Sequence, residues 1–381
     1  MKVTMVGTLP PIKGVSDYCI QQTEVLSRRL DVDFVNFSHI YPERLYPGGT
    51  KETDETFQRR DSVRLTVRAY LDWFNPLGWL WTGLTASGDV LHVHWWTFYL
   101  APVMVAICAA AKLRRIPVVM TVHNVLSHES GPLDRLLTRI AFRLPDRFIV
   151  HTEENRRQLA DIFGVARERT TIIPHGVYTF YDDAAISRED ARRELGLSED
   201  ERALLYFGHI RDYKGLDVLL HAFDIVRREI PSARLIVAGT CWTDWRSYQR
   251  VIDERGLGDR VRLDIGYIES SKVKVYFRGA DLMVLPYLHF EAQSGPGNIA
   301  LAFGVPMVVT ATGGLPKLVR DPDAVAPPGD AEKLAQAIVK ALSDPEKLAR
   351  MAQDSAALAE EFSWPRIADR TIELYEEVLS D

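Results

Sequence analysis

The sequence predicts an α/β protein of two domains, each built around a parallel β-sheet. Its 381 residues exceed the usual size of one domain, about 150 residues, and leave room for two hydrophobic cores. Short apolar runs rich in β-branched residues alternate along the chain with longer segments of helical period. The runs are apolar throughout, which is typical of parallel strands covered by helices on both faces.

The apolar runs are expected to form strands, in the following order. In the first half they are Val3–Val6, Val32–Phe37, Val90–Val93, Val118–Val122, Arg147–His151 and Thr171–Ile173. In the second half they are Leu204–Phe207, Arg234–Ala238, Val261–Asp264, Leu282–Leu285 and Pro306–Thr310. Helices are expected between them, for example from about Ser16 and from about Leu216.

The predicted domain boundary lies near Val177. There, the stretch 174-PHGVYTFYDDAAISREDARREL-195 interrupts the alternation with a turn, acidic and small residues and a short charged helix. We therefore expect an N-terminal domain over residues 1–176 and a C-terminal domain over residues 177–361. A last helix is expected in 362–381, with Ser363 as a candidate cap and Pro365 in the first turn. The polar segment Ser38–Asp61 is expected to be an irregular loop.

Composition argues against several classes of protein. A net charge of −6 and a pI of about 6.0 offer no basic surplus for binding nucleic acid. The three cysteines are far apart, so neither a disulfide framework nor a thiolate metal site is expected. The N-terminus lacks the apolar segment of a secretory signal, and the longest apolar run, Leu100–Lys112, is shorter than the ~20 residues that span a bilayer. We therefore expect a cytoplasmic protein.

Two cations follow a predicted strand in 206-YFGHIRDYKGLDVLL-220. The strand ends at Phe207, the loop carries Arg211 and Lys214, and Gly215 leads into a helix. A guanidinium and an ammonium beside a helix N-terminus suit a doubly charged group such as a pyrophosphate. Solvated surface cations are the alternative, but the carboxyl edge of a parallel sheet is where ligands usually bind.

A second candidate anion site lies in 286-PYLHFEAQSGPGNIALAFGVPMVV-309, where Ser-Gly and Pro-Gly pairs precede an apolar helical segment. The exposed N–H groups and the positive dipole end of a helix N-terminus favour an anion there.

The N-terminal stretch 6-VGTLPPIKGVSDYCIQQTEVLSRRL-30 repeats the order of strand, turn and helix. It matches neither a dinucleotide fingerprint nor a P-loop, and an ordinary turn with Ser16 as the N-cap is an equal alternative. Two histidines, His94 and His123, end neighbouring predicted strands, which favours contact with a ligand over a purely structural role. No third ligand accompanies them, so we expect no metal site.

Together these motifs resemble the retaining glycosyltransferases of family 4, glycosyltransferase group 1. The resemblance covers nearly the whole chain and rests on motifs in matching order. They are the Gly14 loop, "TVHN" at 121–124, "IIPHGV" at 172–177, "FGHIRDYKG" at 207–215, the stretch at 286–309, "ATGGLPKLV" at 311–319 and "FSWPRIA" at 362–368. The resemblance implies the GT-B fold, in which two Rossmann-like domains with parallel sheets face each other across a cleft. It also implies a last helix that returns to the N-terminal domain.

The resemblance implies a role for each matching residue. Arg211 and Lys214 would hold the diphosphate of a nucleotide-sugar donor and stabilise the leaving group, with no metal or other cofactor. Glu291 would hydrogen-bond the donor sugar, and His123 would contact it near its reacting face. The other implied contacts to the donor are Gly14, Gly208, Gly266, Tyr267, Ser294 and Gly295. On the acceptor side, the implied residues are His94 and Trp95.

Two positions depart from the family pattern. Ile299 stands where the family has a second glutamate, which would bind the ribose of the donor. His209 stands where many members have arginine, and Arg211 is the expected substitute. The departure at Ile299 keeps open a non-catalytic protein that binds sugar nucleotides or glycans, and a sugar-nucleotide epimerase of GT-B fold is a further alternative.

The acceptor is the least defined part of this prediction. We expect a hexosyltransferase that acts on a glycan or a lipid-linked acceptor, as in polysaccharide or glycolipid biosynthesis. Between Arg59 and Leu84, arginines give way to aromatic residues, including Trp73, Phe74 and Trp81. This mixture suits either an interfacial surface at the inner face of a membrane or part of a core.

Overall fold

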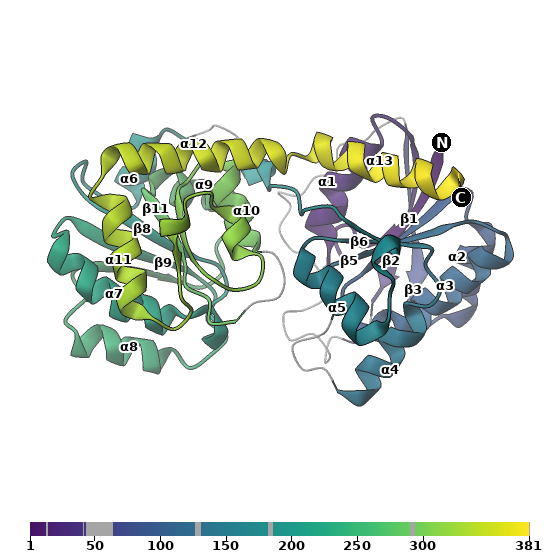
Figure 1. Ribbon diagram of the computed structural model, residues 1–381, viewed down its shortest axis with the longest axis horizontal. Helices are drawn as coiled ribbons and strands as arrows, with labels where there is room; N and C mark the ends of the chain where they lie inside the picture. Colours follow the sequence, from purple (N-terminus) through teal and green to yellow (C-terminus); the bar gives the residue numbers. More distant parts are fainter. Residues whose placement is uncertain are drawn as a thin grey trace. The chain divides into compact units, whose positions relative to one another are not determined.

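The computed structural model describes residues 1–12, 14–40, 42, 64–125, 131–181, 186–289 and 294–380. It divides into two compact units (Figure 1). Unit 1 comprises Met1–Gly176 together with Trp364–Asp381, and unit 2 comprises Val177–Ser363. Each unit is an α/β layer structure with a parallel sheet between helices, so the α/β prediction is confirmed.

Unit 1 contains a seven-stranded sheet in the order β3-β2-β1-β4-β5-β6-β7, and all described pairings are parallel. Its strands are β1 (Lys2–Gly7), β2 (Asp31–His39), β3 (Leu65–Asp72), β4 (Val90–Trp95), β5 (Val118–Val122), β6 (Arg147–Val150) and β7 (Thr170–Ile172). Its helices are α1 (Ser16–Leu26), α2 (Pro76–Thr85), α3 (Ala101–Leu113), α4 (Pro132–Ala141), α5 (Glu153–Phe163) and α13 (Trp364–Ser380), with short 3-10 turns η2 (Phe98–Leu100) and η3 (Arg167–Arg169).

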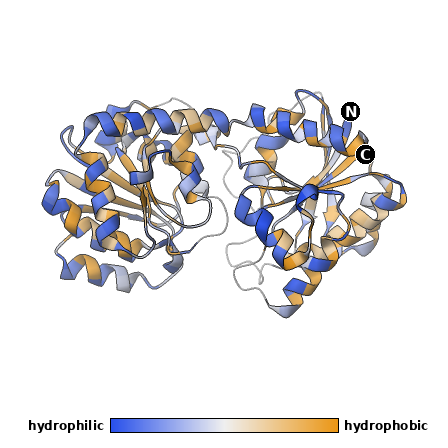
Figure 2. Ribbon diagram, in the orientation of Figure 1, coloured by the Kyte–Doolittle hydropathy of each residue, from blue (hydrophilic) through white to orange (hydrophobic). Residues whose placement is uncertain are grey.

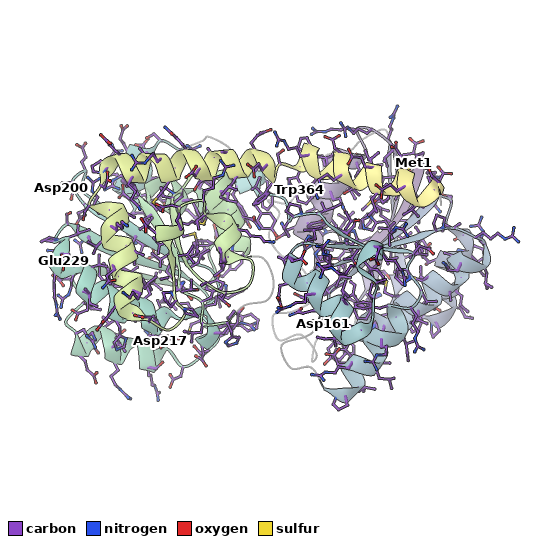
Figure 3. All side chains as sticks on the ribbon, in the orientation of Figure 1. Met1, Asp161, Asp200, Asp217, Glu229 and Trp364 are labelled. Atoms are coloured by element: carbon purple, nitrogen blue, oxygen red, sulfur yellow. The ribbon has the colours of Figure 1, made fainter. Side chains whose placement is uncertain are left out.

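Both faces of the unit 1 sheet are buried. Along β5, Val118 and Met120 face one hydrophobic cluster with α3, while Val119 faces a second cluster with α1 and α13. This burial on both sides explains why the strands are apolar throughout. Figure 3 marks Trp364 at the start of α13, where the indole packs so closely on Gly176 that an added Cβ would lie 2.3 Å from it.

Unit 2 contains a six-stranded parallel sheet in the order β10-β9-β8-β11-β12-β13. Its strands are β8 (Arg202–Phe207), β9 (Ala233–Gly239), β10 (Val261–Ile265), β11 (Leu282–Leu285), β12 (Met307–Thr310) and β13 (Val325–Ala326). Its helices are α6 (Arg188–Glu194), α7 (Leu216–Glu229), α8 (Trp245–Glu254), α9 (Ser270–Gly279), α10 (Gly295–Ala302), α11 (Ala331–Leu342) and α12 (Pro345–Glu361). The 3-10 turns are η4 (Thr179–Tyr181), η5 (Asp212–Lys214), η6 (Leu315–Leu318) and η7 (Pro322–Ala324).

The expected strands are all present, but two edge strands were missed. β3 alternates between exposed and half-buried residues for most of its length, and β13 has two residues. Neither gives the continuous apolar run that the prediction relied on. The segment predicted to be irregular, Ser38–Asp61, lies largely outside the described residues, although β2 continues through its first residues to His39.

Candidate functional site

In each sheet the strand order reverses at one point, and this point locates the site. In unit 2 the reversal falls between β8 and β11, in unit 1 between β1 and β4. Loops at the carboxyl ends of the strands diverge at such a point and leave a crevice in which ligands bind. In unit 2 the loops are the one after β8, with Arg211 and Lys214, and the one after β11, which leads to α10.

Lys214 is the central cation of this edge. Its side chain is buried, its Nζ lies 5.1 Å from the centre of the Tyr287 ring, and burial lowers its pKa. A Cβ built on Gly208 would lie 3.6 Å from Lys214 Nζ and 3.0 Å from Pro296 Cγ, so the ammonium lies near the first turn of α10. Within the described part of the chain, Lys214 has no carboxylate partner. A buried cation without an ion pair is costly, and an anionic ligand would remove that cost.

Arg211 is the second cation, and an aromatic side chain holds it. The guanidinium carbon lies 4.5 Å from the centre of the Trp242 ring, a cation–π contact. His209 packs against the same indole, with ring centroids 5.2 Å apart. Trp242 follows β9 at the same edge of the sheet and was missed by the sequence analysis, although its place after a strand was a usable signal.

The N-terminus of α10 completes the anion site. Ser294 is its N-cap: the Gly297 N–H donates to Ser294 Oγ over 3.2 Å. The Ser294 hydroxyl also contacts Tyr287 Oη at 3.2 Å, and burial raises the pKa of Tyr287 to about 12. Pro296 has no N–H, so Gly295 carries the backbone donor left at the first turn. This donor and the helix dipole favour the same kind of ligand as Lys214.

The prediction at Glu291 falls outside the described residues. Ile299 is buried in the apolar core of unit 2 and offers no polar group to a ligand. Its neighbour Asn298 is only 1 % exposed, and neither its side-chain nitrogen nor its side-chain oxygen has a hydrogen-bond partner among the described residues. A buried amide without partners is rare in folded proteins and points to a missing ligand or water. The sequence analysis missed Asn298.

Gly266 and Tyr267 follow β10, one strand further from the crevice than β9. The Gly266 N–H donates to the Gly239 carbonyl over 3.0 Å, which joins the two loop starts. Tyr267 is 65 % exposed. The two residues therefore lie at the same edge as the cations, with the phenol ring accessible.

The matching edge of unit 1 carries a row of histidines. His94 is the penultimate residue of β4, and His123, His151 and His175 come directly after or near the ends of β5, β6 and β7. Their rings surround Tyr18 of α1, with centroids 4.7 to 5.7 Å from its own. Sequence analysis singled out His94 and His123, and the other two extend the same strand-end pattern.

Hydrogen bonds join three of these rings in a chain, and the carbonyl at one end of the chain fixes which nitrogen donates in each bond. His151 Nδ1 lies 2.9 Å from the Ile173 carbonyl, which only accepts, so this nitrogen carries the proton. In a neutral ring His151 Nε2 must then accept from His123 Nδ1, 3.3 Å away. His123 Nε2 in turn accepts from His94 Nδ1 at 3.1 Å, which leaves His94 Nε2 unprotonated, buried and with no hydrogen-bond partner within the described ranges.

Burial keeps these rings neutral. It lowers the pKa of His151 to about 4 and that of His175 to about 3, and it holds the pKa of His94 and His123 well below the ordinary value. At His94 and His123, repulsion from any neighbouring imidazole that becomes protonated lowers the pKa further. Both ring nitrogens of His123 are engaged, so a hydrogen bond from its ring to a sugar requires one of these bonds to open.

The remaining predicted residues of unit 1 occupy contrasting positions. Gly14 is exposed, with φ of +134°, and the next N–H, of Val15, donates to Thr8 Oγ1 over 3.0 Å. Helix α1 begins at Ser16 with Val15 as its N-cap and no side-chain cap, so the alternative that made Ser16 the cap is wrong. Trp95 is 1 % exposed and packs against Phe142 in the core, so its indole does not lie on the accessible surface.

Two further features bear on the chemistry of the chain. Among the residues that the structure describes, no three His, Cys, Asp or Glu side chains gather in a way that could hold a metal ion. Across the same residues, no helix is long and apolar enough to pass through a bilayer.

Comparison with known proteins agrees with this geometry. A family model described as "Glycosyltransferase Family 4" matches residues 12–179, and one described as "Glycosyl transferases group 1" matches residues 187–357. A D-inositol 3-phosphate glycosyltransferase of Thermobispora bispora is 29% identical over 312 residues, which are 76% of this chain and 71% of that protein.

Solved structures share the fold. HepE of Anabaena, solved in complex with UDP, aligns over 99% of this chain and 100% of its own, with a TM-score of 0.75 and 18% identity. Sucrose-phosphate synthase of Thermosynechococcus elongatus aligns over 100% of this chain and 99% of its own, with a TM-score of 0.72 and 19% identity.

Two parallel α/β units with loops of this kind at their carboxyl edges have the GT-B fold of the solved glycosyltransferases that they match. The two family models, which between them match most of the chain, make the assignment more specific. The chain belongs to the group 1 glycosyltransferases, family 4, as the resemblance predicted.

Proposed function

We propose that unit 2 binds the diphosphate of a nucleotide-diphosphate sugar between Lys214, Arg211 and the first turn of α10. The buried Lys214 ammonium, which lacks a carboxylate partner in the described part of the chain, is the observation that carries this proposal. A diphosphate would pair with this charge, and Arg211 and the Gly295 N–H would share the second phosphate. HepE, solved in complex with UDP-glucose, and the family membership support a donor of this class.

The proposed reaction is the metal-independent transfer of a hexose with retention of configuration. The acceptor hydroxyl attacks the anomeric carbon from the face that the diphosphate leaves. The bond between that carbon and the diphosphate oxygen breaks, and the acceptor proton passes to the leaving phosphate. Lys214 and Arg211 stabilise the charge that develops on the leaving group, which is the task a divalent metal performs in other enzymes.

Further residues are proposed to fix the donor. The Asn298 amide would bind the ribose hydroxyls in place of a carboxylate at position 299, and Gly266 and Tyr267 would lie against the base. His123 and Glu291 would contact the sugar. The Gly14 loop is also proposed to contact the donor, whereas His94 is the proposed neighbour of a glycan or lipid-linked acceptor. We propose that the enzyme acts in the cytoplasm, with peripheral contact at a membrane.

The direct test is incubation of the purified protein with a panel of nucleotide-diphosphate sugars and candidate acceptors, followed by product analysis. A glycosylated product with the donor's anomeric configuration, formed equally well with a chelator present, is expected. An isomerised donor formed without any acceptor would instead identify an epimerase. Donor binding with no turnover on any acceptor would favour a non-catalytic role.

Lys214→Ala and Arg211→Ala are each expected to lower turnover by about 10²–10³, the usual cost of losing one charge-stabilising group. Steady-state kinetics with the preferred donor measures the change. Arg246→Ala, at an exposed arginine on α8 of the same unit, is the matched control and should leave turnover unchanged. Turnover near that of the wild type in Lys214→Ala would contradict the assignment.

A further inference from the structure

Two helices of unit 1 have largely reversed amphipathicity: most of their large apolar residues face solvent, and their fully buried residues are small or polar. These helices are α2 and α4. The exceptions are Leu137 and Trp79, which are partly buried against the core of unit 1. In a helix that packs only on its own domain, the apolar residues form the buried stripe. The reversal therefore indicates that something outside unit 1 covers the exposed faces.

Helix α4 shows the reversal most clearly. Its buried residues are Asp134, Thr138 and Ala141, and the Thr138 hydroxyl donates to Asp134 Oδ1 over 3.1 Å. Leu133 and Leu136 are 62% and 55% exposed. The exposed face continues with Ile140 and with three arginines, Arg135, Arg139 and Arg143. Figure 2 shows hydrophobic and hydrophilic residues alternating along this helix.

Helix α2 carries no charged residue and shows the same pattern. Its buried residues are Thr82 and Gly83, and a Cβ on Gly83 would lie 2.3 Å from the Ile107 carbonyl, so α2 packs closely on α3. Leu77 and Trp81 are 78% and 63% exposed, and Phe74, Leu80 and Leu84 are exposed as well. The indoles of Trp73 and Trp79, by contrast, are half-buried and donate to backbone carbonyls.

The two exposed faces belong to one layer of helices. α3 contacts both α2 and α4 (Figure 1), and its last residue, Leu113, is 82% exposed. The charges of this layer are mostly positive. Asp134 is buried, and Asp146 is paired with Lys112 over 2.5 Å, while Arg135 and Arg143 have no carboxylate partner among the described residues. We name the exposed faces of α2 and α4, with Leu113, the α2/α4 surface.

We infer that the α2/α4 surface docks unit 1 on a lipid bilayer that contains anionic lipids. Exposed leucine and tryptophan side chains insert at the level of the headgroups, and arginines between them pair with lipid phosphates. Unit 1 alone defines the surface. The corollary that the acceptor is lipid-linked rests on the proposed function.

Vesicle flotation with the full chain tests the inference. Phosphatidylcholine vesicles with and without phosphatidylglycerol are the probes, at low and at high salt. We expect the protein to float with the anionic vesicles, and we expect binding to weaken with salt because the arginine contribution is screened. The variant Trp81→Glu/Leu136→Glu should remain at the bottom of the gradient. Leu379→Glu, at a site on α13 that is 45% exposed, is the matched control and should float like the wild type.

A second pair of variants isolates the charge. Arg135→Glu/Arg143→Glu should bind anionic vesicles at least about fivefold more weakly for each arginine, the effect of one basic residue near such a surface. Arg246→Glu/Arg250→Glu, two exposed arginines on α8 of unit 2, should bind as the wild type does. Melting temperatures show whether each variant is folded.

Three outcomes would overturn the inference. One is wild-type protein that does not float with anionic vesicles at low salt. Another is equal loss of binding in the matched control variants. The third is a concentration-dependent dimer that Trp81→Glu/Leu136→Glu abolishes, because the surface would then cover a second copy of the chain. Calorimetry of nucleotide diphosphate binding without vesicles tests the proposed function separately, so the two failures can be told apart.

Discussion

At the scale of single residues, the sequence was most informative for charged residues that lie between a predicted strand and a predicted helix, because ligands bind at that edge of a parallel sheet. Arg211 and Lys214 were identified because they follow a strand and precede a helix. The burial of Lys214 and its place over Tyr287 could not be foreseen, because Tyr287 is 73 positions further along the chain and meets it only through the adjacency of β8 and β11. The same limit applies to Trp242 under Arg211.

Asn298 gives a prediction at this scale. Asn298→Leu replaces a buried amide, which has no partner in the described part of the chain, by an apolar group of similar size, so the melting temperature should stay equal or rise. If the amide binds the donor ribose, the same variant should weaken nucleotide diphosphate binding, which calorimetry measures. Unchanged affinity would remove Asn298 from the donor site and leave the ribose without an assigned partner.

At the scale of elements, the strands that are buried on both faces were predictable, whereas two of the four edge strands, β3 and β13, were missed. β5 presents five buried residues in succession, whereas β3 presents one in eight. Of the four histidines in the row, the sequence analysis singled out two. His94 and His123 stand at the ends of evident strands, while the bond of His151 to the Ile173 carbonyl depends on the pairing of β6 with β7.

The loop that carries Lys214 provides a prediction for this scale. Gly215 and Gly256 both have left-handed backbones, with φ of +65° and +58°. An added Cβ would lie 2.1 Å from the Pro286 carbonyl oxygen at Gly215 and would meet nothing within 4 Å at Gly256. Gly256→Ala should therefore cost only about 1–2 kcal/mol of backbone strain. Gly215→Ala should cost more and should also weaken donor binding, as chemical denaturation and calorimetry would show; equal costs would contradict the close approach.

The histidine row predicts how stability depends on pH. The imidazoles have pKa values near 6.5 when unfolded and lower values when folded, about 4 for His151 and about 3 for His175. Below pH 6.5 the unfolded chain thus binds more protons, so the free energy of unfolding falls as the pH falls toward these values, by up to about 1.4 kcal/mol per pH unit for each ring.

Thermal unfolding of unit 1 between these pH values measures this slope. His151→Gln should flatten it, because one titrating ring is gone, while His221→Gln on α7 of unit 2 is the control and should leave it unchanged. A slope that His151→Gln does not alter would show that His151 does not titrate between its folded and unfolded values.

At the scale of the whole molecule, the chain divides into two units, and one of them is built from two separate segments of the sequence. Unit 1 includes α13 from the far end of the chain, so its core depends on residues on both sides of unit 2. Sequence motifs identified the family correctly because they mark loops at the carboxyl ends of strands, where ligands bind in this type of sheet. The sequence analysis identified the aromatic segment between Arg59 and Leu84 as either core or interfacial surface. Only the exposure of its side chains in the folded protein distinguishes the two.

The central claim is that the buried Lys214 ammonium, which has no carboxylate partner among the described residues, holds the diphosphate of a sugar nucleotide. The most direct measurement is calorimetric titration of UDP, GDP and ADP into the wild type, into Lys214→Met and into the exposed control Lys333→Met. We predict that one diphosphate binds the wild type and the control equally. Lys214→Met should bind it at least about tenfold more weakly, the value of one charge-assisted hydrogen bond, yet melt no lower than the wild type. Equal affinity in Lys214→Met, or no binding of any diphosphate to the wild type, would contradict the account.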